Sequence, residues 1–168
     1  MSSSQAYDAD DAVTLLYSAH YRSLVRLAAL LLRDVGEAEE IVQDAFVAMH
    51  GRWDRLRERD KAVAYLRQAV VNRARSALRH RAVQDRHRPA PLPDAPSAEH
   101  GALAADTRRE VIATLNTLPP RQREALVLRY YLDLSEAEIA AAMGVSRGAV
   151  KSHASRGVAA MRQAMERS

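Results

Sequence analysis

Apolar residues recur every three or four positions through most of this chain, which is the spacing of one face of an α-helix. In the first half the pattern predicts a helix that begins at Asp10 or Asp11, a second that follows Asp34, and a third over about residues 61–81. Asp34 and Glu37 have the spacing of a capping box. The residues expected to face the core are Leu15, Leu16, Ala19, Leu24, Leu27, Ala28 and Leu31 in the first helix, Ile41, Val42, Ala45, Phe46 and Met49 in the second, and Leu66, Ala69, Val70, Ala74, Ala77 and Leu78 in the third.

The second half has the same helical spacing and clearer helix boundaries. Pro120 suits the first turn of a helix, because the N–H that proline lacks has no partner there. Ser135 and Glu138 form a full capping box, Gly144 supplies a left-handed residue after a short helix, and Ser146 caps the next one. No segment alternates with period two, so the fold class is predicted to be all-α. The inward residues of the last helix are expected to be Val150, Ala154, Val158, Met161 and Met165.

A cluster of prolines separates the two halves. Four of the six prolines lie there, and such a stretch cannot hold a helix. We therefore expect two small helical domains joined by a proline-rich linker. The predicted boundaries are an N-terminal tail over residues 1–9, a first domain over 10–83, a flexible linker over 84–106 and a second domain over 107–168. The four prolines are Pro89, Pro91, Pro93 and Pro96.

Composition narrows the class of protein without deciding it. The 168 residues include 25 basic and 21 acidic side chains, and the net charge of +4 permits a polyanionic partner without requiring one. No cysteine is present and the six histidines are scattered, so we expect no metal site and no cofactor. Neither a glycine-rich phosphate loop nor a nucleophile elbow appears, which disfavours an enzyme. The N-terminus does not resemble a secretory signal and the longest apolar run, residues 27–32, is too short to cross a bilayer, so a cytoplasmic protein with no membrane insertion is expected.

The strongest local signal is a capped helix, a glycine turn and a basic helix between Ser135 and Met165. This order is typical of a helix-turn-helix, in which the first helix holds the second at a fixed angle so that it can enter a major groove. An ordinary solvent-exposed helical hairpin is the alternative. The expected outward donors are Arg147, Lys151, Ser152, His153, Ser155 and Arg156.

Two helices of the first half carry opposite charge. Asn72, Arg75 and Arg79 recur at i, i+3 and i+7, a basic stripe that suits phosphates and, through the asparagine, a base edge. The preceding helix is acidic, which suits a basic protein surface better than DNA. Its acidic residues are Asp34, Glu37, Glu39, Glu40 and Asp44. For each face a merely solvated surface is the alternative.

A polar loop over residues 52–60 lies between these two helices and holds the only tryptophan, Trp53. The indole ring is able to stack on an unpaired base. The alternative is that it fills the core between the helices.

The order of these parts resembles the sigma-70 family, specifically the small extracytoplasmic-function (ECF) class that keeps only domains two and four, of a compact actinobacterial type. The stretch from Glu37 to Phe46 is similar to the family's core-binding helix, and Tyr65 to Ala74 to its helix for the −10 element. Domain four is matched by several motifs in order: Leu118-Pro119-Pro120-Arg121-Gln122-Arg123-Glu124, Leu128-Arg129-Tyr130-Tyr131, Leu134-Ser135-Glu136-Ala137-Glu138-Ile139-Ala140, Gly144-Val145-Ser146 and Val150-Lys151-Ser152.

The resemblance implies a promoter-specificity factor for core RNA polymerase and assigns roles to residues. Glu40, Gln43 and Asp44 would bind the coiled coil of the polymerase β′ subunit, and domain four would also contact the β flap. Promoter DNA would be bound at the −10 element by Arg52, Trp53, Asn72, Arg75 and Arg79, with the loop and Asn72 capturing a flipped base. The −35 duplex would be bound by Arg147, Lys151, Ser152, His153 and Arg156. Many family members are held by an anti-sigma factor.

Three positions depart from the family pattern. Ser76 stands where aspartate is frequent, His153 where arginine is common and Ala154 where leucine is common. A different class also fits part of the pattern: a stand-alone helix-turn-helix regulator, with the N-terminal helices forming a dimerisation module. Such a regulator should bind a palindromic duplex as a dimer without polymerase.

Overall fold

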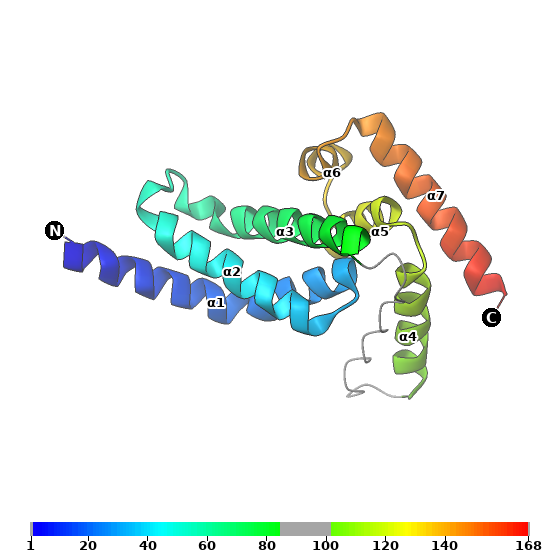
Figure 1. Cartoon of the computed structure of the whole chain (residues 1–168), viewed down its shortest axis with the longest axis horizontal. Coiled ribbons are helices and arrows are strands. Elements are labelled where there is room, and N and C mark those ends of the chain that lie inside the picture. Colours follow the sequence, from blue (N-terminus) through cyan, green and yellow to red (C-terminus); the bar gives the residue numbers. More distant parts are fainter. Residues whose placement is uncertain (1, 85–101, 168) are drawn as a thin grey trace. The chain divides into compact units, whose positions relative to one another are not determined.

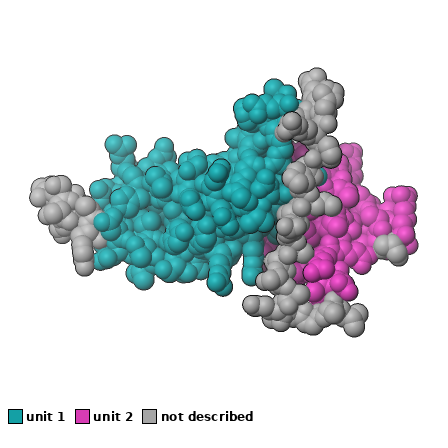
Figure 2. Space-filling view, turned by 60° about the horizontal axis from the view of Figure 1, so that its bottom comes forward, with its two compact units in different colours: residues 1–87 teal, residues 88–168 magenta. Residues whose placement is uncertain are grey.

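A computed structural model of the chain describes residues 2–84 and 102–167, with side chains placed from residue 8 in the first range and from residue 104 in the second. Within these ranges the secondary structure is helical, with no strand, which confirms the predicted all-α class. The chain divides into two compact units, residues 1–87 and 88–168 (Figure 2). The four clustered prolines lie outside the described residues. No described helix is long and apolar enough to cross a membrane.

Unit 1 is built from three helices that each pack on the other two (Figure 1). They are α1 (Ser2–Leu32), α2 (Val35–Arg52) and α3 (Ala62–Gln84), and the short 3-10 turns η1 (Trp53–Arg55) and η2 (Arg59–Lys61) connect α2 to α3. The buried side chains follow the predicted helical spacing, which gives each helix one apolar stripe. The core holds Leu24, Leu27, Ala28, Leu31 and Leu32 of α1, Ala38, Ile41, Val42, Ala45, Phe46 and Met49 of α2, and Ala62, Leu66, Val70, Val71 and Ala74 of α3.

The start of α1 differs from the prediction. The helix begins at Ser2 and runs through Asp10 and Asp11, so these residues are not its cap and residues 2–9 are not a tail. Ala9 is 4 % exposed, so tertiary packing extends back to this turn. The expectation that Leu15 and Ala19 face the core is also wrong, because Leu15 is 72 % exposed and Ala19 is exposed as well.

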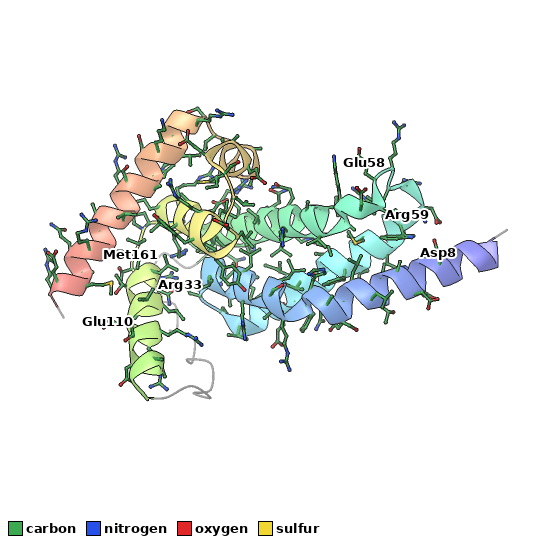
Figure 3. The ribbon with its side chains drawn as sticks, turned by 180° about the vertical axis from the view of Figure 1, so that it is seen from behind. Asp8, Arg33, Glu58, Arg59, Glu110 and Met161 are labelled. Carbon is green, nitrogen blue, oxygen red and sulfur yellow. The ribbon has the colours of Figure 1, made fainter. Side chains whose placement is uncertain are left out.

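The connection between α1 and α2 is a two-residue turn. Arg33, labelled in Figure 3, has a left-handed φ of +63° and ends α1. Its N–H donates to the carbonyl of Ala29 at 2.8 Å. Asp34 then caps α2, accepting from the backbone N–H of Glu37 at 3.1 Å. Only this half of the predicted capping box is present, because the side chain of Glu37 has a different partner.

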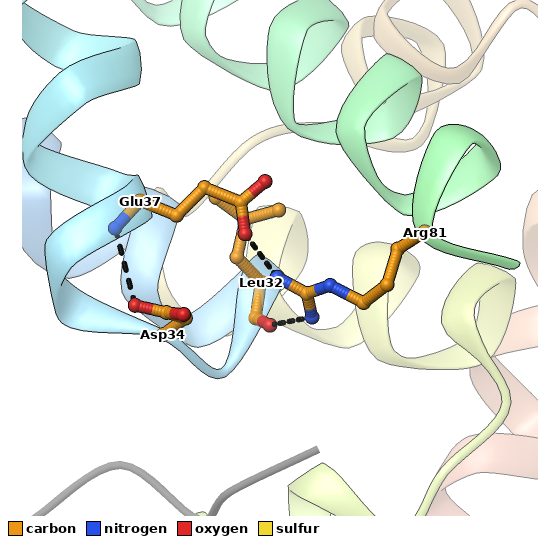
Figure 4. A network of polar contacts seen from close by, with 4 residues as sticks. All are labelled: Leu32, Asp34, Glu37 and Arg81. Atoms are coloured by element: carbon orange, nitrogen blue, oxygen red, sulfur yellow. Dashed lines mark hydrogen bonds and ion pairs between the residues drawn. The ribbon is translucent and has the colours of Figure 1, made fainter. Parts of the chain in front are cut away.

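That partner is Arg81, which joins the three helices at one end of unit 1 (Figure 4). Its guanidinium donates to the carboxylate of Glu37 on α2 and, at 2.7 Å, to the carbonyl of Leu32 at the end of α1. The arginine side chain is 21 % exposed and the glutamate side chain 31 %. This partly buried, charge-assisted contact satisfies one of the carbonyls that the end of α1 leaves without a helical partner.

Unit 2 contains α4 (Ala102–Asn116), α5 (Pro120–Leu126), the π-helical turn η3 (Val127–Tyr131), α6 (Glu136–Met143) and α7 (Arg147–Glu166). Pro120 occupies the first turn of α5, as predicted. Beyond Leu126 the helical chain widens into the π turn. The core of the unit holds Leu115, Leu118, Ala125, Leu126, Val127, Leu128, Ile139, Ala140, Ala142, Met143, Val150 and Ala154.

The predicted helix-turn-helix boundaries are confirmed. The Ser135 side chain accepts from the Glu138 N–H at 3.1 Å, and the Ser135 N–H donates to the Glu138 carboxylate at 3.0 Å. Gly144 is left-handed with φ of +69°, and the N–H of Val145 bonds back to the carbonyl of Ala140 at 3.1 Å, which closes α6 as a Schellman-type end. Bonds from the Ser135 backbone and side chain lower the pKa of the Glu138 carboxyl.

We predict that Arg81→Ala lowers the free energy of unfolding of unit 1 by about 2 kcal/mol, because it removes two hydrogen bonds that carry charge and leaves Glu37 and the Leu32 carbonyl without them. Trp53 is the only tryptophan and lies in unit 1, so its fluorescence during urea denaturation reports this unit alone. Arg73→Ala, at an exposed position of α3, is the matched control and should change the value by less than about 0.5 kcal/mol. Equal effects of the two substitutions would contradict the assigned role of Arg81.

The capping box predicts an acid-sensitive component of unit 2 stability. The pKa of Glu138 is lower in the folded protein than in the unfolded chain, so its carboxylate stabilises the fold at neutral pH. This contribution is lost as the pH falls below the ordinary range of a glutamate, about 4.3. Glu138→Gln should therefore melt at a lower temperature than the parent at pH 7, and the difference should shrink on acidification. Circular dichroism melts across a pH series measure it; a difference that stays constant with pH would contradict the prediction.

Candidate functional site

The position of α7 in unit 2 is fixed by contacts on one of its faces. Val150 is fully buried and Ala154 is 6 % exposed. Gly157 packs so closely that an added Cβ would lie 2.9 Å from Leu126 Cδ1 of α5. These three residues follow helical spacing, so the opposite face of α7 is left to solvent.

A polar contact holds α6 against α5. The guanidinium of Arg121 donates to the carbonyl of Met143, the last residue of α6, at 3.2 Å, and lies 3.4 Å from the carboxylate of Glu124. Ser146 then caps α7 by accepting from the Ala149 N–H at 3.1 Å. Side-chain caps and the left-handed glycine together define the angle between α6 and α7, which is the geometric requirement of a helix-turn-helix.

The predicted donors of α7, apart from His153, lie on its outer face. Arg147, Lys151, Ser152 and Arg156 are exposed and His153 is half-buried. An exposed row of arginine, lysine and hydroxyl donors on a rigidly held helix suits the base edges and phosphates of a duplex groove.

A second row of polar side chains follows α3. Tyr65, Gln68, Asn72, Arg75 and Arg79 recur at intervals of three and four residues, so they share one helix face about 21 Å long. Asn72 and Arg79 are exposed, and the other three are partly exposed. Gln68 Nε2 donates to Asn72 Oδ1 at 3.0 Å, which orients the amide of Asn72 and leaves its own N–H donors as the groups for a partner. Gln68 was not among the predicted residues, although its i, i+4 spacing to Asn72 is visible in the sequence.

The loop between α2 and α3 joins this row at the N-terminal end of α3. Arg52 is exposed and donates to the hydroxyl of Tyr65 at 3.3 Å. Tyr65, like Gln68, was not among the predicted site residues. Trp53 is only 5 % exposed. Its ring therefore belongs to the core of unit 1, which corrects its placement among the DNA-contacting residues and favours the alternative interpretation of the loop.

The acidic face of α2 lies on residues spaced three and four apart. Glu40, Gln43 and Asp44 are exposed, and Val47 continues the same face with 71 % of its surface exposed. Val47 was not among the predicted site residues, because the acidic face was identified from its charges alone, although its helical spacing from Gln43 and Asp44 is visible in the sequence. An exposed apolar group bordered by carboxylates suits a protein partner better than a nucleic acid.

An aromatic cluster joins α1 to the acidic helix α2. The rings of Tyr17 and Tyr21 stack with centroids 4.5 Å apart, and Tyr17 meets Phe46 edge-on at 5.1 Å. Burial, with smaller contributions from Tyr21 and Glu39, raises the pKa of the Tyr17 phenol. Among the described residues there is no cluster of histidine, aspartate and glutamate side chains that would hold a metal ion.

Two family models match the chain, one in each unit. Residues 16–83 match Sigma-70 region 2, and residues 108–161 match Sigma-70, region 4. The chain is 35 % identical over 144 residues to the RNA polymerase sigma-E factor of Streptomyces avermitilis, covering 86 % of this chain and 79 % of that protein. It is 32 % identical over 141 residues to the ECF RNA polymerase sigma factor SigM of Mycobacterium tuberculosis, covering 84 % and 70 %.

Solved structures show the same fold. The sigma factor RpoE, in complex with the anti-sigma factor NepR from Bartonella quintana, aligns with a TM-score of 0.74 and 25 % identity over 91 % of this chain and 96 % of that one. CnrH, in complex with the cytosolic domain of CnrY, aligns with a TM-score of 0.65 and 24 % identity over 96 % and 94 %. The chain therefore belongs to the sigma-70 family, as a sigma factor of the ECF class that directs promoter-specific transcription initiation by RNA polymerase.

Proposed function

We propose that this sigma factor divides its contacts among three helices: α7 binds the −35 duplex, α3 and the loop before it bind the −10 element, and α2 binds core polymerase. One observation carries the proposal. Glu40 and Asp44 of α2, Arg79 of α3, and Arg147, Lys151 and Arg156 of α7 are exposed, whereas Glu37 and Arg81 of unit 1 are bonded to each other. Sigma factors are DNA-binding regulators rather than enzymes, and a cytoplasmic location, where polymerase works, fits this role.

In the −35 duplex, α7 is proposed to lie in the major groove. Arg147 and Lys151 are near its N-terminal end and donate to base edges, where guanine offers two acceptors. Ser152 and His153 contact bases or phosphates beside them. Arg156, one turn further along, binds a phosphate and so sets the register of the helix without reading sequence.

At the −10 element, Asn72 is proposed to hydrogen-bond a base that has left the stack, since it is exposed and Gln68 orients its amide. Arg75 and Arg79 bind neighbouring phosphates along the same face, and Arg52 adds a donor at the loop. Trp53 supports the loop from the core instead of stacking on the base. Ser76 is exposed on the same helix, so an aspartate contact frequent in the family is absent here.

Core polymerase is proposed to bind the acidic face of α2 through the coiled coil of its β′ subunit. Glu40, Gln43 and Asp44 supply charge and hydrogen bonds, and Val47 adds an apolar contact at the end of the row. Unit 2 contacts the β flap.

The aligned solved structures of RpoE and CnrH hold the anti-sigma factor NepR and the cytosolic domain of CnrY, respectively, which supports an anti-sigma partner for this chain also. The alternative of a stand-alone dimeric regulator is not favoured, because matches to both sigma regions account for both units.

We predict that binding to polymerase and binding to the −35 element can be separated by substitution. Lys151→Ala should lower run-off transcription from a −35-dependent promoter about tenfold, the loss of one good base contact, and leave affinity for core polymerase unchanged. Asp44→Arg should weaken core binding about tenfold by placing like charges together. Run-off transcription with core polymerase on genomic fragments, paired with a core-binding titration, measures both. If Lys151→Ala also loses core binding, the role assigned to α7 is wrong.

Substitutions of Asn72 and Arg79 should affect DNA binding in different ways, because Asn72 is proposed to contact a base and Arg79 a phosphate. Asn72→Ala should reduce discrimination between a matched and a mutated −10 element by about 1–3 kcal/mol. Arg79→Ala should weaken binding to both sequences alike and make binding less dependent on salt. Holoenzyme titrated with fork-junction DNA at several salt concentrations distinguishes the two. A uniform effect of Asn72→Ala would contradict the proposed base contact.

A further inference from the structure

The first turns of α1 contact the loop that precedes α3. Residues 2–15, here named the N-terminal arm, lie before the start of the sigma region 2 match at residue 16. Arg59 Nη1 of η2 donates to Asp8 Oδ2 at 3.0 Å, across 51 positions of sequence (Figure 3). Asp10 Oδ1 lies 2.5 Å from His50 Nε2, close to the end of α2. One carboxylate of the arm therefore contacts the loop, and the other contacts the last turn of the helix that leads into it.

Besides an exposed ion pair between Lys61 Nζ and Glu58 Oε2 at 2.8 Å, the loop has few internal contacts. Both 3-10 turns lack a side-chain cap, and of the residues between Trp53 and Lys61 only Trp53 is buried. The guanidinium of Arg59 lies over the Trp53 ring, 5.2 Å from its centroid. Arg59 is therefore held on one side by the core tryptophan and on the other by Asp8, and it connects the exposed part of the loop to the body of unit 1.

We propose that the N-terminal arm positions the −10 loop, with Asp8 acting through Arg59 and Asp10 through His50. This inference rests on the proposed function of the loop, and it makes Asp8 and Asp10 positioning residues that do not touch DNA. Asp8 and Arg59 are 59 % and 48 % exposed, so their pair adds little to global stability. Its effect is on where the loop lies, and therefore on how well a captured base is discriminated.

A competing role for Asp8 has the opposite sign. An exposed carboxylate on an arginine of a DNA-facing loop could occupy the place of a phosphate, and its removal would then strengthen DNA binding. The contact with Trp53 favours positioning, because the Arg59 guanidinium lies over a core ring as well as beside Asp8.

The test uses holoenzyme assembled from the full chain and core polymerase, with fork-junction DNA bearing a matched or a mutated −10 strand from a promoter that the parent factor transcribes. Asp8→Asn should lower the matched-to-mutated affinity ratio about two- to fivefold, the range for loss of an exposed ion pair. Core affinity and the Trp53 fluorescence midpoint in urea should not change. Asp11→Asn removes the same charge from an exposed position of the same arm, and it controls for the general effect of one fewer acid near DNA.

Reversing the charges of the Asp8–Arg59 pair provides the decisive test. Arg59→Asp alone should lower the ratio, and Asp8→Arg combined with Arg59→Asp should restore at least half of the loss. An unchanged ratio in Asp8→Asn, a tighter complex with both DNAs, or a failure of the double variant to recover would each overturn the proposal. If the parent holoenzyme itself shows no −10 discrimination, the proposed function of the loop is wrong. That result is distinct from one in which the loop discriminates but the N-terminal arm does not position it.

Discussion

Each helix of this protein buries one apolar stripe and leaves its opposite side to solvent, and this one-sided packing determines which charges a partner can meet. In unit 1 the stripes of three helices meet in a single core, so polar residues at the edge of the stripes are close to one another. Arg81 and Glu37 lie at such an edge and bind each other. Asp44 and Arg79 lie away from it and are exposed. The same packing therefore determines which charged residues stabilise the fold and which are exposed for a partner.

The second unit has charged side chains in its core, and they help to hold the helices that present α7. Arg123 is 1 % exposed and donates to the carbonyl of Leu118 at 3.2 Å, just before the start of α5. Hydrogen bonds offset part of the cost of burying an arginine, and this bond fixes the turn that leads into α5. From α5 the contacts pass to α6 through Arg121 and to α7 through the close approach at Gly157. The outer face of α7 is consequently presented by a preorganised body, which lowers the entropy cost of entering a groove.

Local sequence signals predicted the parts of this fold that depend on neighbouring residues. The capping box of Ser135, the left-handed Gly144 and the cap at Ser146 follow from short-range hydrogen bonding and backbone sterics, which a single sequence records. The partners of Arg81 and Asp8 lie 44 and 51 positions away, and no local pattern specifies them. The start of α1 was missed for the same reason, since a serine and aspartate-rich segment looks like a cap until its tertiary contacts are known.

Opposite charges on one small unit also limit how strongly the free factor can bind DNA. The net charge is only +4, because acidic residues such as Glu40 and Asp44 offset the arginines of α3. Phosphate contacts supply most of the affinity of a DNA-binding protein, and the rows on α3 and α7 offer only a few cations each. The acidic face of α2 repels DNA and reduces this affinity further, and a basic surface of polymerase bound there, as proposed, would cover it. Binding of core polymerase to α2 would therefore remove an electrostatic penalty on DNA binding elsewhere in the same unit, which couples promoter binding to polymerase without any change in the fold.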